Sequence, residues 1–71
     1  MEQIGIYTEF IRLQEFLKFA GAVPTGGTAK EVIAEGLVSV NGTTCMQRGR
    51  KLHPGDRVSF EGIELEVVHA D

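Results

Sequence analysis

The chain has 71 residues, 42% of them hydrophobic, which suffices for one small core and excludes a large catalytic domain. A single cysteine, Cys45, excludes an internal disulfide, and small domains of oxidising compartments usually carry several, so we expect a cytoplasmic protein. The opening sequence MEQIGIYTEF lacks the basic segment and apolar core of a targeting signal. No apolar run approaches the roughly 20 residues that cross a bilayer, so we expect no membrane partner.

Charge is distributed unevenly beneath the formal net charge of −3. All seven Lys and Arg residues lie between Arg12 and Arg57, where only four acidic residues accompany them. The flanking segments contain acidic residues and no basic ones. The middle of the chain is therefore basic, which allows a phosphate-facing surface in a nominally acidic protein.

The first third of the chain predicts a short strand followed by a helix. Residues 3–7 alternate, with Ile4 and Ile6 on one side, which is typical of a strand or an extended arm. The period then changes to that of a helix, which we expect Gly21 to end. The apolar face of this helix is formed by Leu13, Phe16, Leu17 and Ala20.

A second helix is predicted after a glycine-rich turn. Thr25-Gly26-Gly27-Thr28 provides a flexible turn with a capping hydroxyl, and we expect the helix to start near Thr28. Gly36 lies where a left-handed residue would end it, and Leu37 follows as a hydrophobic closure. Its apolar face is formed by Ala29, Val32 and Ile33. The two helices can pack as a pair.

The second half of the chain predicts two hairpins. Val38 and Val40 lead into Asn41-Gly42, a dipeptide suited to a two-residue hairpin turn, with residues 43–46 as the return strand. Residues 47–51 are too polar for the core, and residues 53–56 form a turn. Strands with Val58 and Phe60, then Ile63, Leu65 and Val67, flank Glu61-Gly62. We therefore expect one α+β domain over residues 1–71, with two helices packed on a small, mostly antiparallel sheet.

The order of these motifs resembles the RNA-binding domain named after ribosomal small-subunit protein S4, over roughly residues 12–60. The family's first helix opens Arg-Leu-Asp-x-Phe-Leu, which residues 12–17, RLQEFL, match. Its second helix reads Ala-Lys/Arg-x-x-Ile-x-x-Gly, which Ala29, Lys30, Ile33 and Gly36 match. Its Val-x-Val-Asn-Gly and Pro-Gly-Asp elements recur at residues 38–42 and 54–56. The resemblance implies a two-helix αL motif, with an N-terminal strand and a C-terminal hairpin added to the core, that binds structured RNA as a small stand-alone protein.

One motif departs from the family. Thr25-Gly26 stands where Ser-Arg is usual, so an Arg that commonly contacts phosphate is absent. Gly26 and Gly27 allow close approach of the backbone, whose free N–H groups at the helix start can receive a phosphate oxygen instead. The alternative is that the two glycines only permit a tight turn.

Phosphate contact requires cations on one surface, and Arg and Lys supply them. The segment Arg48-Gly49-Arg50-Lys51 is the strongest candidate. Lys18 and Arg57 have acidic neighbours and are expected to be surface residues or partners in local ion pairs. Phe16 and Phe60 fit the core pattern, so base stacking of the single-strand kind is a poor fit and structured RNA is favoured. The expected RNA-binding residues are Arg12, Thr25, Gly26, Gly27, Lys30, Arg48, Arg50 and Lys51.

Other functions have weaker support in the sequence. His53, His69 and Cys45 show no nucleophile–base or zinc-ligand spacing, so we expect neither catalysis, metal, cofactor nor small-molecule substrate. A ubiquitin-like or sulfur-carrier protein would end in Gly-Gly, whereas this chain ends in Ala70-Asp71. A protein-interaction module that uses the acidic C-terminal hairpin remains an alternative. The resemblance favours ribosomal RNA as the target, bound by a monomer during ribosome assembly, maturation or quality control.

Overall fold

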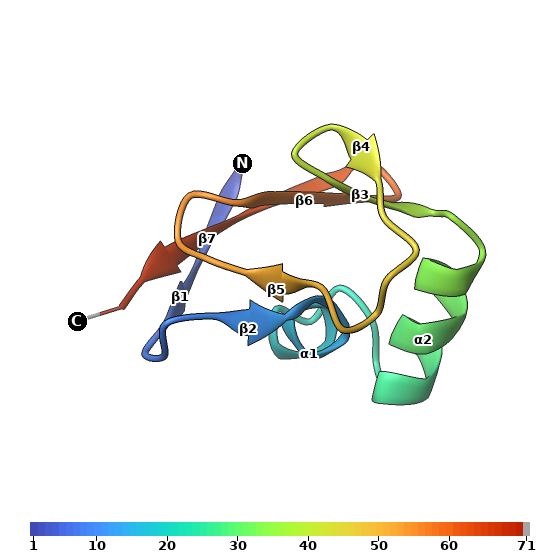
Figure 1. Cartoon of the computed structure of the whole chain (residues 1–71), viewed down its shortest axis with the longest axis horizontal. Coiled ribbons are helices and arrows are strands. Elements are labelled where there is room, and N and C mark those ends of the chain that lie inside the picture. Colours follow the sequence, from blue (N-terminus) through green and yellow to red (C-terminus); the bar gives the residue numbers. More distant parts are fainter. Residues whose placement is uncertain (71) are drawn as a thin grey trace.

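A computed structural model describes residues 1–70. Its elements are β1 (Glu2–Ile6), β2 (Ile11–Arg12), α1 (Leu13–Phe19), α2 (Gly26–Ala34), β3 (Val38–Val40), β4 (Thr43–Thr44), β5 (Lys51–Leu52), β6 (Arg57–Phe60) and β7 (Ile63–His69). A five-stranded sheet lies on one side of the molecule, and the two helices pack against each other on the other side (Figure 1). This is the α+β architecture expected from the sequence. Neither helix in the described chain is long and apolar enough to span a membrane.

The sheet order is β1-β7-β6-β3-β4. Strand β1 runs parallel to β7, and the remaining pairs are antiparallel. Both predicted hairpin turns form: Asn41 and Gly42 have φ of 52° and 84°, and Glu61 and Gly62 have φ of 50° and 78°. Positive φ at both central residues gives the type I′ twist that suits antiparallel strands. The return strand β4 is shorter than the predicted 43–46.

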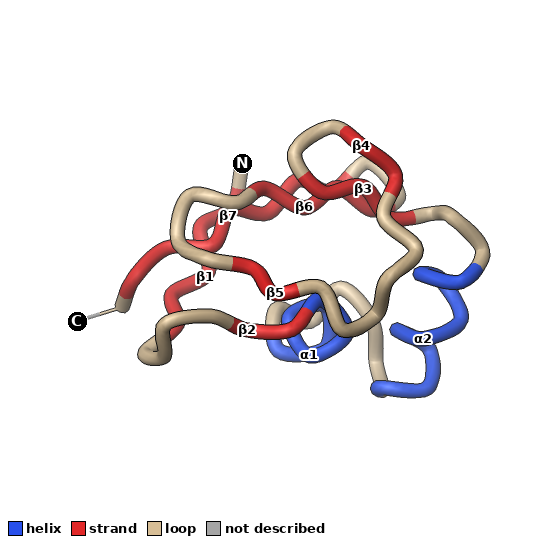
Figure 2. The backbone as a smooth tube through the Cα atoms, in the orientation of Figure 1, coloured by secondary structure: helices blue, strands red, loops and turns tan. Residues whose placement is uncertain are grey.

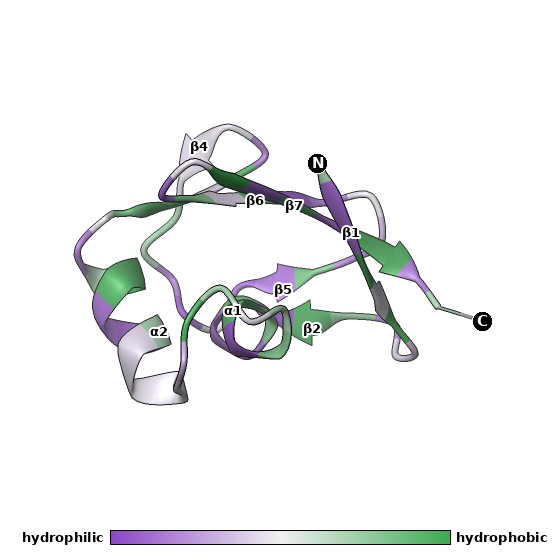
Figure 3. Cartoon of the chain, turned by 180° about the vertical axis from the view of Figure 1, so that it is seen from behind, coloured by the Kyte–Doolittle hydropathy of each residue, from purple (hydrophilic) through white to green (hydrophobic). Residues whose placement is uncertain are grey.

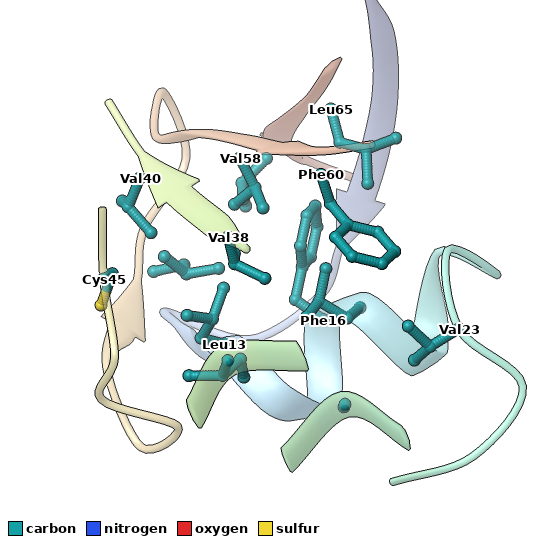
Figure 4. Packing of buried hydrophobic residues seen from close by; sticks show 14 of the residues in the cluster. Leu13, Phe16, Val23, Val38, Val40, Cys45, Val58, Phe60 and Leu65 are labelled. Carbon is teal, nitrogen blue, oxygen red and sulfur yellow. The ribbon is translucent and has the colours of Figure 1, made fainter. Parts of the chain in front are cut away.

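The core lies between the sheet and the helices (Figure 4). Leu13 and Phe16 of α1 point toward Val38, Val58 and Phe60 of the sheet. Phe16 is fully buried and Phe60 is 5% exposed, as predicted for both. The predicted helical faces are confirmed: each helix buries the side that its apolar spacing marked.

Helix α2 begins two residues before the predicted Thr28. Thr25 is its N-cap in extended conformation, and the Thr25 hydroxyl accepts a hydrogen bond of 3.1 Å from the Thr28 amide. A side-chain oxygen that satisfies the third amide of a helix lets the helix start directly after the cap. Gly26 and Gly27 therefore belong to the first turn of α2 and do not form a separate loop.

A second, two-stranded sheet was not predicted. Strands β2 and β5 pair antiparallel in the register Ile11 with Leu52 and Arg12 with Lys51. Figure 2 shows this short ribbon between the five-stranded sheet and α1, with the loop from β4 leading into β5. The ribbon brings the basic segment after residue 47 back to the beginning of α1.

Candidate nucleic-acid interface

The β2/β5 ribbon brings two of the predicted cations together. Arg12 and Lys51 face each other across the antiparallel pair, and both side chains are exposed. Their neighbours Ile11 and Leu52 alternate toward the interior, where Leu52 is fully buried. The apolar members of the ribbon thus anchor it to the core while the cationic members stay in solvent.

The loop that carries Arg48 and Arg50 is fixed to the start of α1. The amide of Leu13 donates to the carbonyl of Arg50 at 2.8 Å, and the amide of Gln14 donates to the carbonyl of Arg48 at 3.1 Å. The N-cap of α1 makes no side-chain hydrogen bond, so these carbonyls satisfy amides that a helix start leaves free. The loop is therefore held by its backbone, and both Arg side chains remain exposed.

Phe10 joins this group, although the sequence had not indicated it. Its ring centroid lies 5.6 Å from the guanidinium carbon of Arg12 and 4.8 Å from Nζ of Lys51. The His53 ring also lies beside the Phe10 ring, with their centroids 6.1 Å apart and their planes tilted by 46°. Phe10 and Arg12 are two residues apart, so an extended backbone places both side chains on the same side. The sequence alone does not show that this segment is extended, so the spacing could not have identified Phe10.

The turn after β5 is tied to the β3/β4 hairpin. The Asp56 carboxylate accepts from the His53 amide at 2.7 Å and from Asn41 Nδ2 at 3.1 Å. The Asn41 side chain also accepts from the Arg57 amide at 2.9 Å. Partial burial alone would raise the pKa of Asp56. The hydrogen bonds from His53 and Asn41 to its carboxylate and the charges of His53 and Arg50 outweigh burial, so the pKa lies below its ordinary value. The two motifs that resemble the family thus form one hydrogen-bonded unit.

The remaining predicted residues form a second group at the start of α2. Apart from the adjoining residues and the helix backbone, no atom of residues 1–70 lies within 4 Å of a Cβ built on Gly26, and Thr25 Oγ1 lies 3.7 Å from one built on Gly27. Figure 3 shows this end of α2 almost white, which marks residues of intermediate hydropathy. Lys30 is exposed one turn further on. Within residues 1–70, no hydrogen bond joins this group to residues 48–51, the basic loop.

Two aromatic side chains that the sequence left unplaced are exposed: Tyr7 is 82% and Phe19 60% accessible. Lys18 and Arg57 are exposed as well, outside the basic loop. Lys18 lies in the last turn of α1, and Arg57 begins β6 in the large sheet. Cys45 is buried, with 6% exposure.

The chain belongs to the S4 domain family, whose sequence model matches residues 4–68. This match extends past the 12–60 core of the resemblance and includes most of β1 and of β7.

Particular relatives span nearly the whole chain. A Bacillus subtilis protein named "Probable ribosome maturation protein RlbA" is 48% identical over 67 residues, which is 93% of this chain and 94% of the relative. YbcJ of Escherichia coli is 38% identical over 58 residues, 82% of this chain and 83% of YbcJ. Its solution structure, described as revealing an αL motif involved in RNA binding, has a TM-score of 0.66 at 34% identity and covers 94% of this chain and 84% of YbcJ.

The fold also recurs within a larger protein. Ribosomal protein S4e of the small subunit of Thermoplasma acidophilum gives a TM-score of 0.69 over 90% of this chain and 34% of its own. Its sequence identity is 22%, so this likeness concerns the fold alone.

Proposed function

We propose that this protein is a non-catalytic RNA-binding domain that recognises structured RNA, with ribosomal RNA as its target. The names and descriptions of the Bacillus subtilis and Escherichia coli relatives, which refer to ribosome maturation and RNA binding, support this proposal. It acts in the cytoplasm as a monomer, in ribosome assembly, maturation or quality control, and requires no cofactor. The whole of residues 1–71 forms the binding domain.

One observation carries the proposal: four cations are gathered beside the start of α1 by the backbone. The Leu13–Arg50 and Gln14–Arg48 hydrogen bonds fix the loop, and the β2/β5 register sets Lys51 against Arg12. A folded protein gains no stability from crowding like charges, whereas polyanionic RNA is bound by such a surface through release of counterions. The loop is ordered before RNA arrives, so little conformational entropy is lost on binding.

The start of α2 supplies a second contact in this proposal. Gly26 is half-buried and Gly27 exposed, with open space at their Cβ positions, so an anion can approach here, where the positive end of the helix dipole favours it. Lys30 adds a cation on the same helix. Backbone N–H groups here replace the Arg that the family usually provides before this helix.

The proposal is tested by paired charge removal. R48Q/R50Q removes two cations from the basic loop, and K18Q/R57Q removes two exposed cations elsewhere, so both variants have the same net charge. We expect R48Q/R50Q to weaken binding to rRNA fragments at least tenfold and to reduce the salt slope by about 0.7–0.9 for each phosphate that is no longer neutralised. The K18Q/R57Q variant should retain most of the affinity. No retention of rRNA by the wild-type protein at low salt would refute the proposal.

Sedimentation with ribosomal particles separates the RNA target from a protein target. If the acidic hairpin were the docking surface, E61Q/E64Q would no longer associate with particles, because both carboxylates are exposed and would meet a basic partner. We expect this variant to co-sediment like wild type and R48Q/R50Q to be released. The opposite pattern would favour protein docking.

A further inference from the structure

We propose that Phe10 is a positioning residue that holds Arg12 and Lys51 as one preformed site for RNA phosphate. This inference rests on the proposed RNA binding and adds how that surface is kept ready. It also adds a residue that the family's motifs, as matched in this sequence, do not include.

The pairing of Arg12 with Lys51 is unfavourable by itself. Like charges directly opposite each other on antiparallel strands repel, and the β2/β5 ribbon is only two residues long on each side. So short a ribbon has few hydrogen bonds to offset the repulsion. The apolar side chains of the ribbon hold its backbone in place, and a contact that attracts both cations, or a bound anion, would lower the remaining cost of their repulsion.

The Phe10 ring provides the compensating contact. The electron-rich face of an aromatic ring attracts cations within about 6 Å of its centroid, and Arg12 and Lys51 both lie within this distance, at 5.6 and 4.8 Å. A ring that two cations share reduces the net cost of their proximity. It also restricts two of the most flexible side chains in proteins before RNA is bound.

Phe10 is itself held in place. The Thr8 hydroxyl donates to the Phe10 carbonyl at 2.7 Å, and the His53 ring packs against the phenyl ring. His53 belongs to the turn that Asp56 closes through the His53 amide. The backbone of Phe10 is thus tied to the preceding residues and its ring contacts the turn after β5, so the ring can impose a position on the two cations.

Substitution at position 10 tests this role. F10L keeps an apolar side chain and removes the ring, whereas F10W keeps a stronger ring face. F19L is the matched control, because Phe19 is 60% exposed at the opposite end of α1.

Affinity for an rRNA fragment is measured at one fixed salt concentration. We expect F10L to weaken binding about three- to tenfold, because a cation–π contact contributes about two- to fivefold per cation at exposed sites. F10W and F19L should remain within about twofold of wild type.

A double-variant cycle separates positioning from general packing. In the R12M/K51M background the ring has no cations to hold, so F10L should have no further effect there. If F10L is poorly folded by circular dichroism, pentafluorophenylalanine at position 10 keeps the shape of the ring and reverses the charge of its face. That substitution should reproduce the decrease in affinity.

Several results would overturn the inference. These are an F10L affinity equal to or above that of wild type, an F10W decrease as large as that of F10L, or an F10L decrease that persists in R12M/K51M. Wild-type protein that binds no RNA would instead refute the proposed function. Wild-type binding that R48Q/R50Q weakens and F10L leaves unchanged would refute the role of Phe10 alone.

Discussion

Changing Asp56 to Asn should weaken the junction between the β3/β4 hairpin and the turn that precedes β6. The carboxylate accepts two hydrogen bonds on separate oxygens, from the His53 amide and from Asn41 Nδ2. An Asn side chain has only one acceptor oxygen and presents an NH₂ group in place of the other. One of the two donors would therefore be left without its partner and meet a second donor.

The expected destabilisation follows from the kind of bond removed. A hydrogen bond to a charged group contributes about 1.5–3 kcal/mol, and the partial exposure of Asp56 favours the lower part of that range. We expect D56N to lower the free energy of unfolding by about 2 kcal/mol at pH 7. A domain of this length has a total of roughly 4–10 kcal/mol, so this is a large fraction. With a urea slope of about 1 kcal/mol/M, the midpoint falls by about 2 M.

The destabilisation should depend on pH. The pKa of Asp56 is lowered on folding from its ordinary value of 3.8, so the charged form stabilises the folded state. That contribution is complete above the unfolded-state pKa and is lost as pH falls through the folded-state pKa. The difference in the free energy of unfolding between wild type and D56N should therefore be constant from about pH 7 to about pH 5. It should narrow progressively below about pH 4.

Urea titrations followed by circular dichroism at several pH values measure this difference. E64Q is the matched control, because Glu64 is exposed and its substitution should change stability by less than about 0.5 kcal/mol. A D56N effect that stays the same at pH 3 and pH 7 would refute the contribution of charge. An effect no larger than that of E64Q would refute the anchoring role of the carboxylate.

Two further changes test single features of the helices. Gln14 Oε1 is buried and has no hydrogen-bond partner within residues 1–70, so Gln14→Met should raise the free energy of unfolding by about 0.5–1.5 kcal/mol; an unchanged or lower melting temperature in a thermal melt would contradict this. Gly27→Ala should stabilise α2 by about 0.5–1 kcal/mol, since a Cβ there would meet only Thr25 Oγ1 at 3.7 Å. Gly27→Gln should fold but bind RNA more weakly, and unchanged affinity would remove the backbone of α2 from the proposed interface.

Much of the fold could be predicted because its signals are local. The apolar spacing of Leu13, Phe16 and Leu17 follows from helical geometry alone, and all three are fully buried. Asn41-Gly42 predicts its turn because few other dipeptides accept positive φ at both positions. Each of these signals is complete within a few residues of the chain.

The β2/β5 ribbon could not be predicted, because strands of two residues carry no alternation and their pairing joins distant segments. Consequently Arg12 and Lys51 could be predicted as RNA-binding residues, but their position opposite each other could not. The position of Phe10 beside them could not be predicted either. The predicted start of α2 differs from the observed start for another reason. Glycines are poor helix formers, and the Thr25 cap overrides that propensity. RNA binding by the predicted residues stays a prediction, which the affinity of R48Q/R50Q measures.

The parallel pairing of β1 with β7 has a consequence for how fast the protein folds and unfolds. Gln3 and Glu66, which share a side-chain hydrogen bond in this pair, are 63 positions apart in sequence. Closing such a long loop is entropically costly, whereas the helix pair and the two hairpins need only nearby residues. Strand β1 is therefore expected to dock after the folding transition state, so that substitutions in it mainly accelerate unfolding.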